Sequence, residues 1–417
     1  MSEEHRPRVV IVAGYFDWIS GYQETALASA YAEFADVEVV SSDRVSPGFS
    51  DEHLERLGVS RRYAPGTTQE RGIRVTRFPT REIRSIVWSR QAAEYIGGRG
   101  CDLLIQVMPG HGLPVAASLT RNRAPRAVLY GDNWAMWGHL GPVARRLKWI
   151  IFSLTKGLAY AFVNSRATVT YGYTENTLDR LRIFRAQCPM RLLPLGYAGN
   201  RFFLDESLRT ATRTRFGFTP EDVVLVAAGK YTPHKRLDWV LGAYEDAARR
   251  RPELRLLIAG LDDSPPCREF KDMISRSEAS DRITTLGFLG AEELNAVYNA
   301  ADLAIWPRYP AITIQQAMGT GLPVILPRND LVGHLVRAGE HTGLYFGLTP
   351  GEEQPSVTAA VASALDVLDL SASARSTRRY RNAWLSSEAL ARTVLADTGV
   401  ADAIATLPGA LERDVAR

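Results

Sequence analysis

The stretch "DVVLVAAGKYTPHKRLDWVL", residues 222–241, decides the fold class. A short continuous apolar run ends at Gly229, a loop with basic residues follows, and helical spacing begins near residue 236. Continuous apolar runs of this length are typical of strands buried on both faces, which belong to parallel sheets covered by helices. The stretch therefore predicts a strand–loop–helix unit of an α/β domain.

The same unit recurs in two series along the chain, and each series predicts a doubly wound, Rossmann-like sheet that binds ligands at the carboxyl ends of its strands. The expected strands of the first series are 8–14, 37–42, 73–78, 102–108, 126–131 and 167–173. Those of the second series are 222–229, 254–260, 282–288, 302–307 and 322–327, with helices at 236–250, 266–279 and 291–300.

The length of the chain agrees with this division, since 417 residues are too many for one ordinary core. We expect an N-terminal domain over residues 1–200 and a C-terminal domain over 201–370, facing each other across a cleft. A helical segment over 371–417 is expected to pack back toward the N-terminal domain.

The composition excludes several classes of protein. Apolar residues make up 46% and charged residues 23%, a globular balance, and a net charge of +4 without dense basic runs gives no indication of nucleic acid binding. Three scattered cysteines with no CxxC pair argue against a disulfide framework or a zinc site. We expect no signal peptide at the charged N-terminus and no transmembrane helix, and hence a cytoplasmic protein.

The segment "RRLKWIIFSLTKGLAYAF", from Arg145, allows two interpretations. It is either a buried helix, which we favour, or a helix on a membrane surface with its basic end in the headgroups. The second interpretation would make the protein peripheral to a membrane.

Two lysines follow the strand at 222–229. Lys230 comes directly after Gly229 and Lys235 follows five residues later. Two compact ammonium groups beside a glycine at a strand tip suit an anionic ligand. The alternative is that both are solvated loop residues. The pattern GxxxxGK[ST] is missing, so the loop is not a P-loop.

A second anion signal lies in "WPRYPAITIQQAMGTGLPVIL", residues 306–326. Thr313 and Gln316 have the T-x-x-Q spacing of a capping box, which predicts a helix beginning at Thr313. A helix N-terminus favours an anion by roughly 0.3–1 kcal/mol when exposed and up to about 2 kcal/mol when partly buried. Thr313 alone is equally explained as a structural cap, but together with the two lysines it predicts a diphosphate site.

Several motifs resemble one enzyme family. "GKYTPHKR" resembles its G-R-x-x-x-x-K-G element, and "SGYQETALASAYAEF" its G-G-x-E loop and helix. "ITTLGFLGAEELNAVYNAADLAIWP", "QAMGTGLPVI" and "LPLGYAGNRF" are similar to three further blocks of the same family. The family that these motifs resemble is that of the retaining nucleotide-sugar glycosyltransferases of family four, which have the GT-B fold. The resemblance covers roughly residues 8–347 and is stronger in the C-terminal half.

The resemblance implies a metal-independent hexosyltransferase without cofactor. It would transfer a sugar, with retention, from a nucleotide diphosphate such as UDP or GDP to a small-molecule, glycan or lipid-linked hydroxyl acceptor. Lys230 and Lys235 would hold the donor diphosphate and stabilise the leaving group. The other donor-site positions that it implies are Gly21, Gly229, Gly287, Phe288, Leu289, Ile312, Thr313 and Gln316.

The sequence departs from the family at its carboxylates. The family has two glutamates eight residues apart, whereas this chain has Arg308 and Gln316. A neutral hydrogen bond contributes about 0.5–1.5 kcal/mol and one to a charged group about 1.5–3, so Gln316 would hold a ribose more weakly. His334 stands where the family has another glutamate. We expect it to have a structural role, with contact to a ligand as the alternative. An unusual donor sugar, with fewer hydroxyls, is one hypothesis for these changes.

The N-terminal half offers candidates for the acceptor side. Asp132 follows the strand at 126–131 and is expected to contact the sugar or activate the acceptor hydroxyl, or else to cap a helix. Asn133 and Trp134 are expected to face the cleft, and His111, in "MPGHGLP", to lie at the acceptor site. The aromatic stretch "YFDWISGY", residues 15–22, would form an acceptor wall or pack the domain edge.

Two other functions fit the same residues. A degenerate GT-B protein would bind a nucleotide or glycan without transfer, which the missing carboxylates favour. A GT-B epimerase would convert a nucleotide sugar without any acceptor. Consumption of the nucleotide sugar with and without an acceptor distinguishes these functions from transfer.

Overall fold

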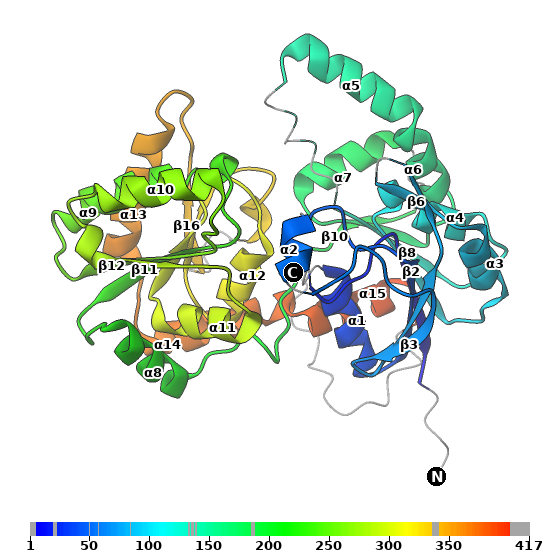
Figure 1. Cartoon of the computed structure of the whole chain (residues 1–417), viewed down its shortest axis with the longest axis horizontal. Coiled ribbons are helices and arrows are strands. Elements are labelled where there is room, and N and C mark those ends of the chain that lie inside the picture. Colours follow the sequence, from blue (N-terminus) through cyan, green and yellow to red (C-terminus); the bar gives the residue numbers. More distant parts are fainter. Residues whose placement is uncertain are drawn as a thin grey trace. The chain divides into compact units, whose positions relative to one another are not determined.

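The computed structural model describes residues 6–19, 23–49, 51–56, 58–83, 85–131, 134, 137, 140–184, 188–335 and 342–400. The chain forms two compact units (Figure 1). The first comprises Met1–Pro194 and Ser387–Arg417, and the second comprises Leu195–Ser386.

The first unit contains a sheet of eight described strands. They are β1 (Arg8–Ala13), β2 (Asp36–Ser42), β3 (Gly66–Glu70), β4 (Ile73–Phe78), β7 (Leu103–Val107), β8 (Arg126–Tyr130), β9 (Val169–Gly172) and β10 (Met190–Leu192). Their spatial order is β10-β9-β8-β7-β1-β2-β4-β3, and all neighbours are parallel except β3 and β4. The strand order reverses between β1 and β7, which places a ligand-binding switch point there. A separate hairpin joins β5 (Arg81–Ile83) and β6 (Ile86–Trp88).

The first unit also contains α-helices. They are α1 (Gln23–Ala32), α2 (Asp51–Arg56), α3 (Arg90–Gly98), α4 (Leu113–Ser118), α5 (Pro142–Leu154), α6 (Lys156–Asn164), α7 (Glu175–Leu181) and α15 (Ser387–Asp397). Ile96 of α3 and Leu113 of α4 belong to one buried cluster with Val10 and Val12 of β1. The last of these helices, α15, packs beside α1. It is tied to β9 by Tyr171, whose hydroxyl donates to Asp397 Oδ2 at 2.6 Å.

The second unit is a six-stranded parallel sheet. Its strands are β11 (Val223–Ala228), β12 (Leu254–Ala259), β13 (Ile283–Leu286), β14 (Leu303–Ile305), β15 (Val324–Pro327) and β16 (Gly343–Phe346). The spatial order is β13-β12-β11-β14-β15-β16. Numbered within the unit, this is 3-2-1-4-5-6, the Rossmann order, and its switch point lies between β11 and β14.

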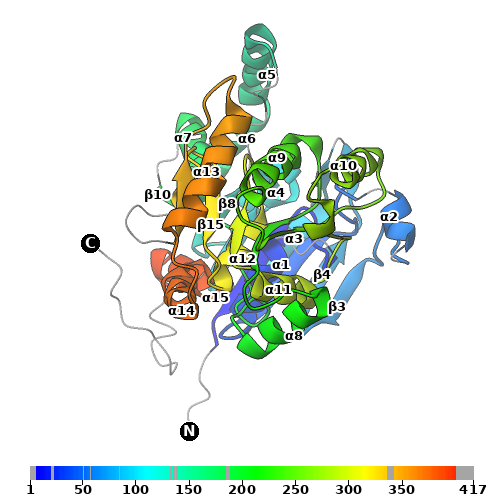
Figure 2. The ribbon, with the colours of Figure 1, turned by 90° about the vertical axis from the view of Figure 1, so that its left-hand side faces the viewer.

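Both faces of the second sheet carry helices. These are α8 (Glu206–Phe216), α9 (Leu237–Ala248), α10 (Pro265–Ser275), α11 (Ala291–Ala300), α12 (Ile312–Gly319), α13 (Glu353–Val367) and α14 (Ala372–Arg381). Figure 1 shows α9, α10 and α13 on one face and α8, α11 and α14 on the other. The pair α9 and α13 packs side by side (Figure 2).

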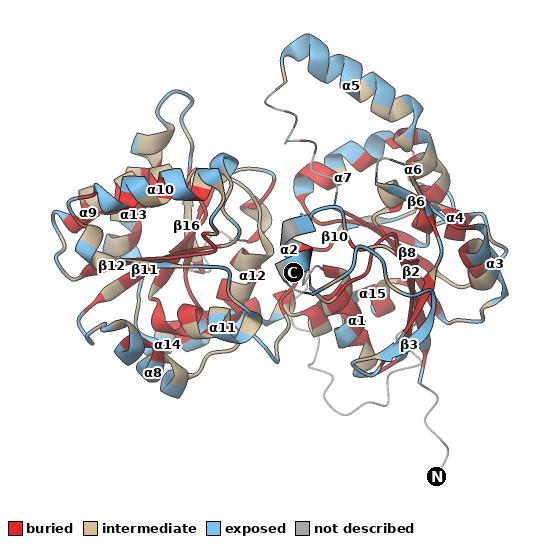
Figure 3. Ribbon diagram, in the orientation of Figure 1, coloured by how far each residue is buried: buried red, intermediate tan, exposed pale blue. Residues whose placement is uncertain are grey.

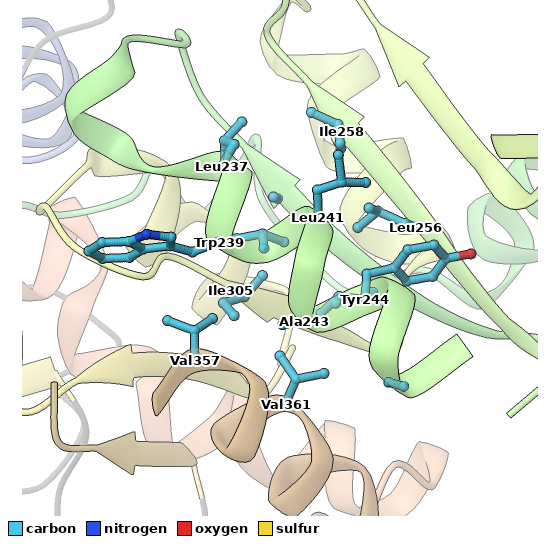
Figure 4. Close-up of a cluster of buried hydrophobic side chains, with 14 of the residues drawn as sticks. Leu237, Trp239, Leu241, Ala243, Tyr244, Leu256, Ile258, Ile305, Val357 and Val361 are labelled. Carbon is cyan, nitrogen blue, oxygen red and sulfur yellow. The ribbon is translucent and has the colours of Figure 1, made fainter. Parts of the chain in front are cut away.

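A buried cluster fixes the position of α9 against the sheet. Leu241 and Tyr244 of α9 lie against Leu256 and Ile258 of β12, and Val361 of α13 closes the cluster (Figure 4). Because α9 directly follows the loop that holds both lysines, this packing also anchors the end of that loop.

The α/β class with two doubly wound sheets is confirmed, and every expected strand is present. The expected segment 371–417 is divided, because α14 belongs to the second unit and α15 to the first. Buried arginines of α14 hold it in place, with Arg375 donating to backbone carbonyls around the ends of α11 and α12. The boundary therefore lies at Ser386, sixteen residues later than expected.

Over the part of the chain that the structure describes, no single helix is long and apolar enough to cross a membrane. The helices Glu353–Val367 and Ala372–Leu385 pass that test only when taken together, and they are bent by 113° at their break.

Candidate functional site

The site of the second unit lies at the carboxyl ends of β11 and β14. Ala228 is the last residue of β11 and is followed by Gly229 and Lys230, while Trp306 follows β14 and α12 begins at Ile312. Neighbouring parallel strands whose connections run in opposite directions leave a crevice at this edge. The strand order thus brings together segments that are more than 70 residues apart in sequence.

Gly229 lets these segments approach closely. Its φ is 127°, a backbone conformation open to glycine, and a Cβ placed there would lie 3.2 Å from both Lys235 Nζ and Thr313 Oγ1. Gly260, at the end of β12, has φ 105°, and its Cβ would lie 2.5 Å from the Gly229 carbonyl oxygen. The ammonium of Lys235 and the start of α12 therefore converge over the Gly229 backbone, as the sequence predicts.

The position of Lys235 disfavours the charged form of its side chain. Burial, reinforced by the charge of Lys230, lowers its pKa from 10.5 to about 8. Lys230 itself is exposed. Because burial and a like charge both disfavour the ammonium form, an anion bound between the two lysines would stabilise that form. Strongly shifted lysines of this kind cluster at functional sites.

The predicted capping box at Thr313 is wrong. The helix α12 begins at Ile312, and the residue at its N-cap position, Ala311, makes no side-chain cap bond. The Thr313 hydroxyl instead donates to the Ala228 carbonyl oxygen at 3.0 Å, and Trp306 Nε1 donates to the same oxygen at 2.9 Å. Thr313 thus fastens α12 to the tip of β11, and the amides of Ile312 and Thr313 belong to the first turn, which has no intrahelical acceptors for them.

Gln316 carries a buried acceptor without a donor. Its Oε1 has no hydrogen-bond partner among the described residues. Leaving such a group unpaired costs about 1–3 kcal/mol. A hydrogen bond donated by a ligand hydroxyl would offset this cost. This is the behaviour expected of the residue that the resemblance places at the ribose.

His334 lies in the turn Gly333–Leu335 that follows β15, the neighbour of β14. Neither ring nitrogen has a described partner, and burial lowers its pKa to about 4. The imidazole is therefore neutral near pH 7 and offers one donor and one acceptor on the same edge of the sheet.

A small pocket opens beside the lysine and contains a residue that the sequence treated only as a missing glutamate. Gly229, Lys235, Trp306, Arg308 and Tyr309 belong to its lining, and no carboxylate occurs among the described residues that line it. The Arg308 guanidinium lies 5.3 Å from the centre of the Tyr309 ring. The position of Arg308, eight residues before Gln316, was the available signal for a ligand-facing side chain.

The predicted nucleobase positions follow β13. Gly287 and Phe288 are exposed, Phe288 by 68%, and Leu289 is half-buried. They lie on the same carboxyl edge as Gly229 but two strands away, and they do not line the pocket beside Lys235. A ligand contacting both places would have to extend along the edge of the sheet.

In the first unit, His111 lies at the switch point between β1 and β7. It is the last residue of the turn Pro109–His111 after β7. A Cβ added to Gly14, the residue after β1, would overlap the Cβ of His111. Its ring packs edge-on to Tyr15 with centroids 5.2 Å apart. Burial, with a smaller contribution from the charge of Lys156, lowers its pKa to about 4, so the imidazole is neutral.

Other acceptor-side predictions fare differently. Trp134 is buried in an aromatic cluster, with its ring 5.9 Å from that of Trp149 and 5.5 Å from that of Phe152, so it packs the core of the unit and does not face a cleft. Gly21, Asp132 and Asn133 lie outside the described residues.

Glu24 is a candidate that the sequence analysis did not single out. It stands in the first turn of α1, after the strand β1, and burial is the main cause that raises its pKa to about 7. Asp17 raises the pKa further. A carboxyl group that titrates near neutral pH can accept or donate a proton in catalysis. Its place in "SGYQETALAS" was the available signal.

The described ranges contain no group of three or more His, Cys, Asp or Glu side chains placed to hold a metal ion.

The geometry of the second unit agrees with a known family. Residues 222–366 match the family described as "Glycosyl transferases group 1". The second unit is a group 1 glycosyltransferase domain. This match confirms the resemblance seen in its motifs.

Similar proteins of known function extend the comparison. Mannosylfructose-phosphate synthase of Agrobacterium fabrum is 28% identical over 162 residues, 36% of this chain and 35% of that protein. A GDP-mannose-dependent α-(1-6)-phosphatidylinositol monomannoside mannosyltransferase of Mycolicibacterium smegmatis is 25% identical over 250 residues, 54% of this chain and 64% of that protein. The chain thus spans about one-third to two-thirds of the length of these relatives.

Solved structures match nearly the whole chain. Sucrose-phosphate synthase of Thermosynechococcus elongatus has a TM-score of 0.66 at 16% identity, covering 93% of this chain and 97% of that one. Anabaena HepE in complex with UDP and glucose has a TM-score of 0.62 at 16% identity, covering 97% and 100%. At this identity the likeness shows the fold, and the GT-B architecture is confirmed.

Proposed function

We propose that the protein is a glycosyltransferase that moves a sugar from a nucleotide diphosphate sugar to a hydroxyl acceptor. One observation carries the proposal: the partly buried Lys235 ammonium is held over Gly229, beside the start of α12, at the β11/β14 switch point. The family match over residues 222–366 supports the same reaction.

The second unit would supply the chemistry of the leaving group. Lys230, Lys235 and the first amides of α12 would bind the diphosphate, and their positive charge would stabilise the negative charge that develops on it as the bond to the sugar breaks. Since these groups already provide cations and donors, the reaction needs no metal. Retention of the anomeric configuration is carried over from the resemblance.

Other residues of the second unit would orient the donor. Gln316 Oε1 would accept a hydrogen bond from a ribose hydroxyl, and the exposed ring of Phe288 would contact the base. Arg308 lines the pocket beside Lys235, where it would face the sugar or the phosphate next to it.

The first unit would hold the acceptor. Glu24, with its pKa near 7, and the neutral His111 lie at carboxyl strand ends, where they can exchange a proton with or orient a hydroxyl group. The names of the relatives include a sugar-phosphate synthase and a lipid mannosyltransferase. We infer a small-molecule, glycan or lipid-linked acceptor and a cytoplasmic location.

The test is consumption of UDP-, GDP- and ADP-sugars in the presence of EDTA, with and without a mixture of hydroxyl acceptors. Transfer predicts release of one nucleoside diphosphate that requires an acceptor. Conversion of the sugar without an acceptor would identify an epimerase. Binding without any consumption would identify a protein that has lost transfer.

Replacing Gln316 with leucine is expected to weaken donor binding by roughly 2- to 10-fold, the worth of one neutral hydrogen bond. The unfolding temperature should not fall, because the variant removes an acceptor that has no described partner. Binding of the donor and of its 2′,3′-dideoxyribose analogue is measured for both proteins. The wild type should prefer the ribose form and the variant should not; equal loss of both ligands would remove Gln316 from the ribose site.

A further inference from the structure

The helix α5 presents an apolar face to solvent. It has no buried residue, and Val143, Leu147, Ile150, Ile151 and Leu154 are each between 46% and 83% exposed. Their spacing of four, three, one and three residues places all five on one side of a helix, the pattern of a face that normally packs against a core. Figure 3 shows α5 as exposed along most of its length. The favoured interpretation of this segment as a buried helix is therefore wrong for α5.

The opposite side of α5 is held by its own unit. The ring of Trp149 stacks on Phe152 with centroids 5.7 Å apart, and Phe152 packs edge-on to Tyr160 of α6 and to Trp134 at 5.6 and 5.5 Å. These contacts fix the rotation of the helix. The apolar stripe thus faces outward because the aromatic side faces inward.

Positive charge accompanies the stripe. Arg145, Arg146 and Lys148 are exposed on α5, and the sequence from Pro142 to Asn164 contains no aspartate or glutamate. With a turn of about 100° per residue, Arg146 and Lys148 fall on opposite sides of the stripe. Long basic side chains in this position can keep their charges at a polar boundary while their stems cover apolar surface.

We propose that α5 binds the surface of an anionic lipid bilayer. The helix lies in the plane of the interface, with Leu147, Ile150 and Ile151 at the level of the acyl chains. Arg146 and Lys148 then contact the lipid phosphates, and Leu158, which is 64% exposed at the start of α6, extends the apolar contact. An amphipathic helix with flanking basic residues binds anionic membranes in this way. The proposal does not depend on the transfer reaction.

The charges favour a bilayer over a second copy of the chain. Pairing two α5 stripes would bring Arg146 and Lys148 of each copy near the same cations of the other, without a carboxylate in residues 142–164 to offset them. Like charges in proximity disfavour such a contact. At 13 residues, α5 is about 20 Å long, too short to span a bilayer of about 30 Å, so the helix lies on the surface.

The test is flotation of the full-length protein with vesicles of phosphatidylcholine alone and with about 30% phosphatidylglycerol. The wild type should bind the anionic vesicles at least about 10-fold more tightly, and salt near 0.5 M should reduce the difference by screening. Leu147→Glu/Ile151→Glu should lose binding to anionic vesicles at least 10-fold. Arg146→Gln/Lys148→Gln should lose only the preference for the anionic lipid.

A matched control carries the same charge change on exposed apolar residues elsewhere. Met273→Glu/Val367→Glu alters side chains that are 41% and 66% exposed, and it should bind vesicles like the wild type. The proposal is overturned if the control loses binding equally, or if the wild type does not distinguish the two vesicles. It is also overturned if the wild type sediments as a dimer that Leu147→Glu/Ile151→Glu dissociates with vesicle binding unchanged. If Leu147→Glu/Ile151→Glu does not fold, the test rests on Arg146→Gln/Lys148→Gln, and an unchanged preference for anionic vesicles in that variant overturns the proposal.

Discussion

Replacing Lys235 with methionine is expected to lower kcat/KM for the donor by about 10²- to 10³-fold. One group that stabilises developing negative charge in a preorganised site contributes about this much. Lys235 is the partly buried cation of the site, and its ammonium lies beside the Gly229 backbone, so the exposed Lys230 cannot replace it. Methionine keeps the length and the apolar stem while removing the charge.

The same substitution is expected to stabilise the free protein at pH 7 by about 1–2 kcal/mol, after allowance for the partial exposure of the side chain. Burial lowers the pKa of Lys235 from 10.5 to about 8, so the unfolded chain binds the proton more tightly than the folded one. The charged lysine therefore destabilises the fold below pH 8. The difference between variant and wild type should shrink as the pH rises from about 8 to 10.5, because the folded protein releases its proton first.

Both effects are measured on purified protein, by initial rates with the donor and by chemical denaturation between pH 7 and pH 10. Lys271→Met is the control, since that lysine lies on the surface of α10 and pairs with Asp263 at 3.1 Å. It should leave both activity and the pH dependence of stability close to wild type. Wild-type turnover in Lys235→Met would remove this residue from the mechanism.

Replacing Arg375 with methionine is expected to destabilise the second unit by about 3–5 kcal/mol. The buried guanidinium donates to the carbonyl oxygens of Tyr298, Asn299, Ala301 and Thr320 at 2.7–3.1 Å. These carbonyls lie at the ends of α11 and α12, where helices lack internal donors. Each buried carbonyl left without a donor costs about 1–3 kcal/mol, partly offset by the dehydration of the arginine that is no longer required.

Thermal unfolding measures this loss, which corresponds to a fall of roughly 10 °C for a unit of this size. The exposed Arg379, on the same helix α14, supplies the control as Arg379→Met, which should change the unfolding temperature little. A wild-type unfolding temperature in Arg375→Met would show that α14 does not anchor α12.

Residues at strand ends could be predicted from the sequence because a parallel sheet restricts where they lie. The apolar run 222–229 is buried on both faces and ends at Gly229, so Lys230 and Lys235 had to stand at the carboxyl edge. The repetition of such runs also predicted two doubly wound sheets. The two lysines converge with α12 because of the order of the strands in the sheet. The alternation of strands and helices in the sequence is compatible with this order but does not determine it.

Contacts between distant segments were harder to predict. The capping box at Thr313 failed because its hydroxyl bonds Ala228, a residue 85 positions away, and local spacing carries no information about that neighbour. Arg308 could not be placed for the same reason, since the lining of a pocket depends on how several loops meet.

The burial of α5 could not be predicted from its periodicity. An apolar stripe has the same sequence pattern whether a sheet, a partner or a membrane covers it. The aromatic side chains Trp149 and Phe152 determine which side of the helix packs inward, and their partners Tyr160 and Trp134 are known only from the fold. The basic residues of α5 and the absence of carboxylates around them were the one sequence feature that favoured an exposed helix at a membrane surface.

The central claim is that Lys235 binds the diphosphate of a nucleotide, and calorimetry at pH 8 without metal tests it most directly. UDP, GDP and ADP are titrated into the wild type and Lys235→Met in two buffers of different ionisation enthalpy. With a pKa near 8, Lys235 is half protonated in the free protein, so binding of one of these nucleotides should take up about half a proton in the wild type and none in the variant. No binding of any of them, or binding with the same proton uptake in both proteins, would contradict the account.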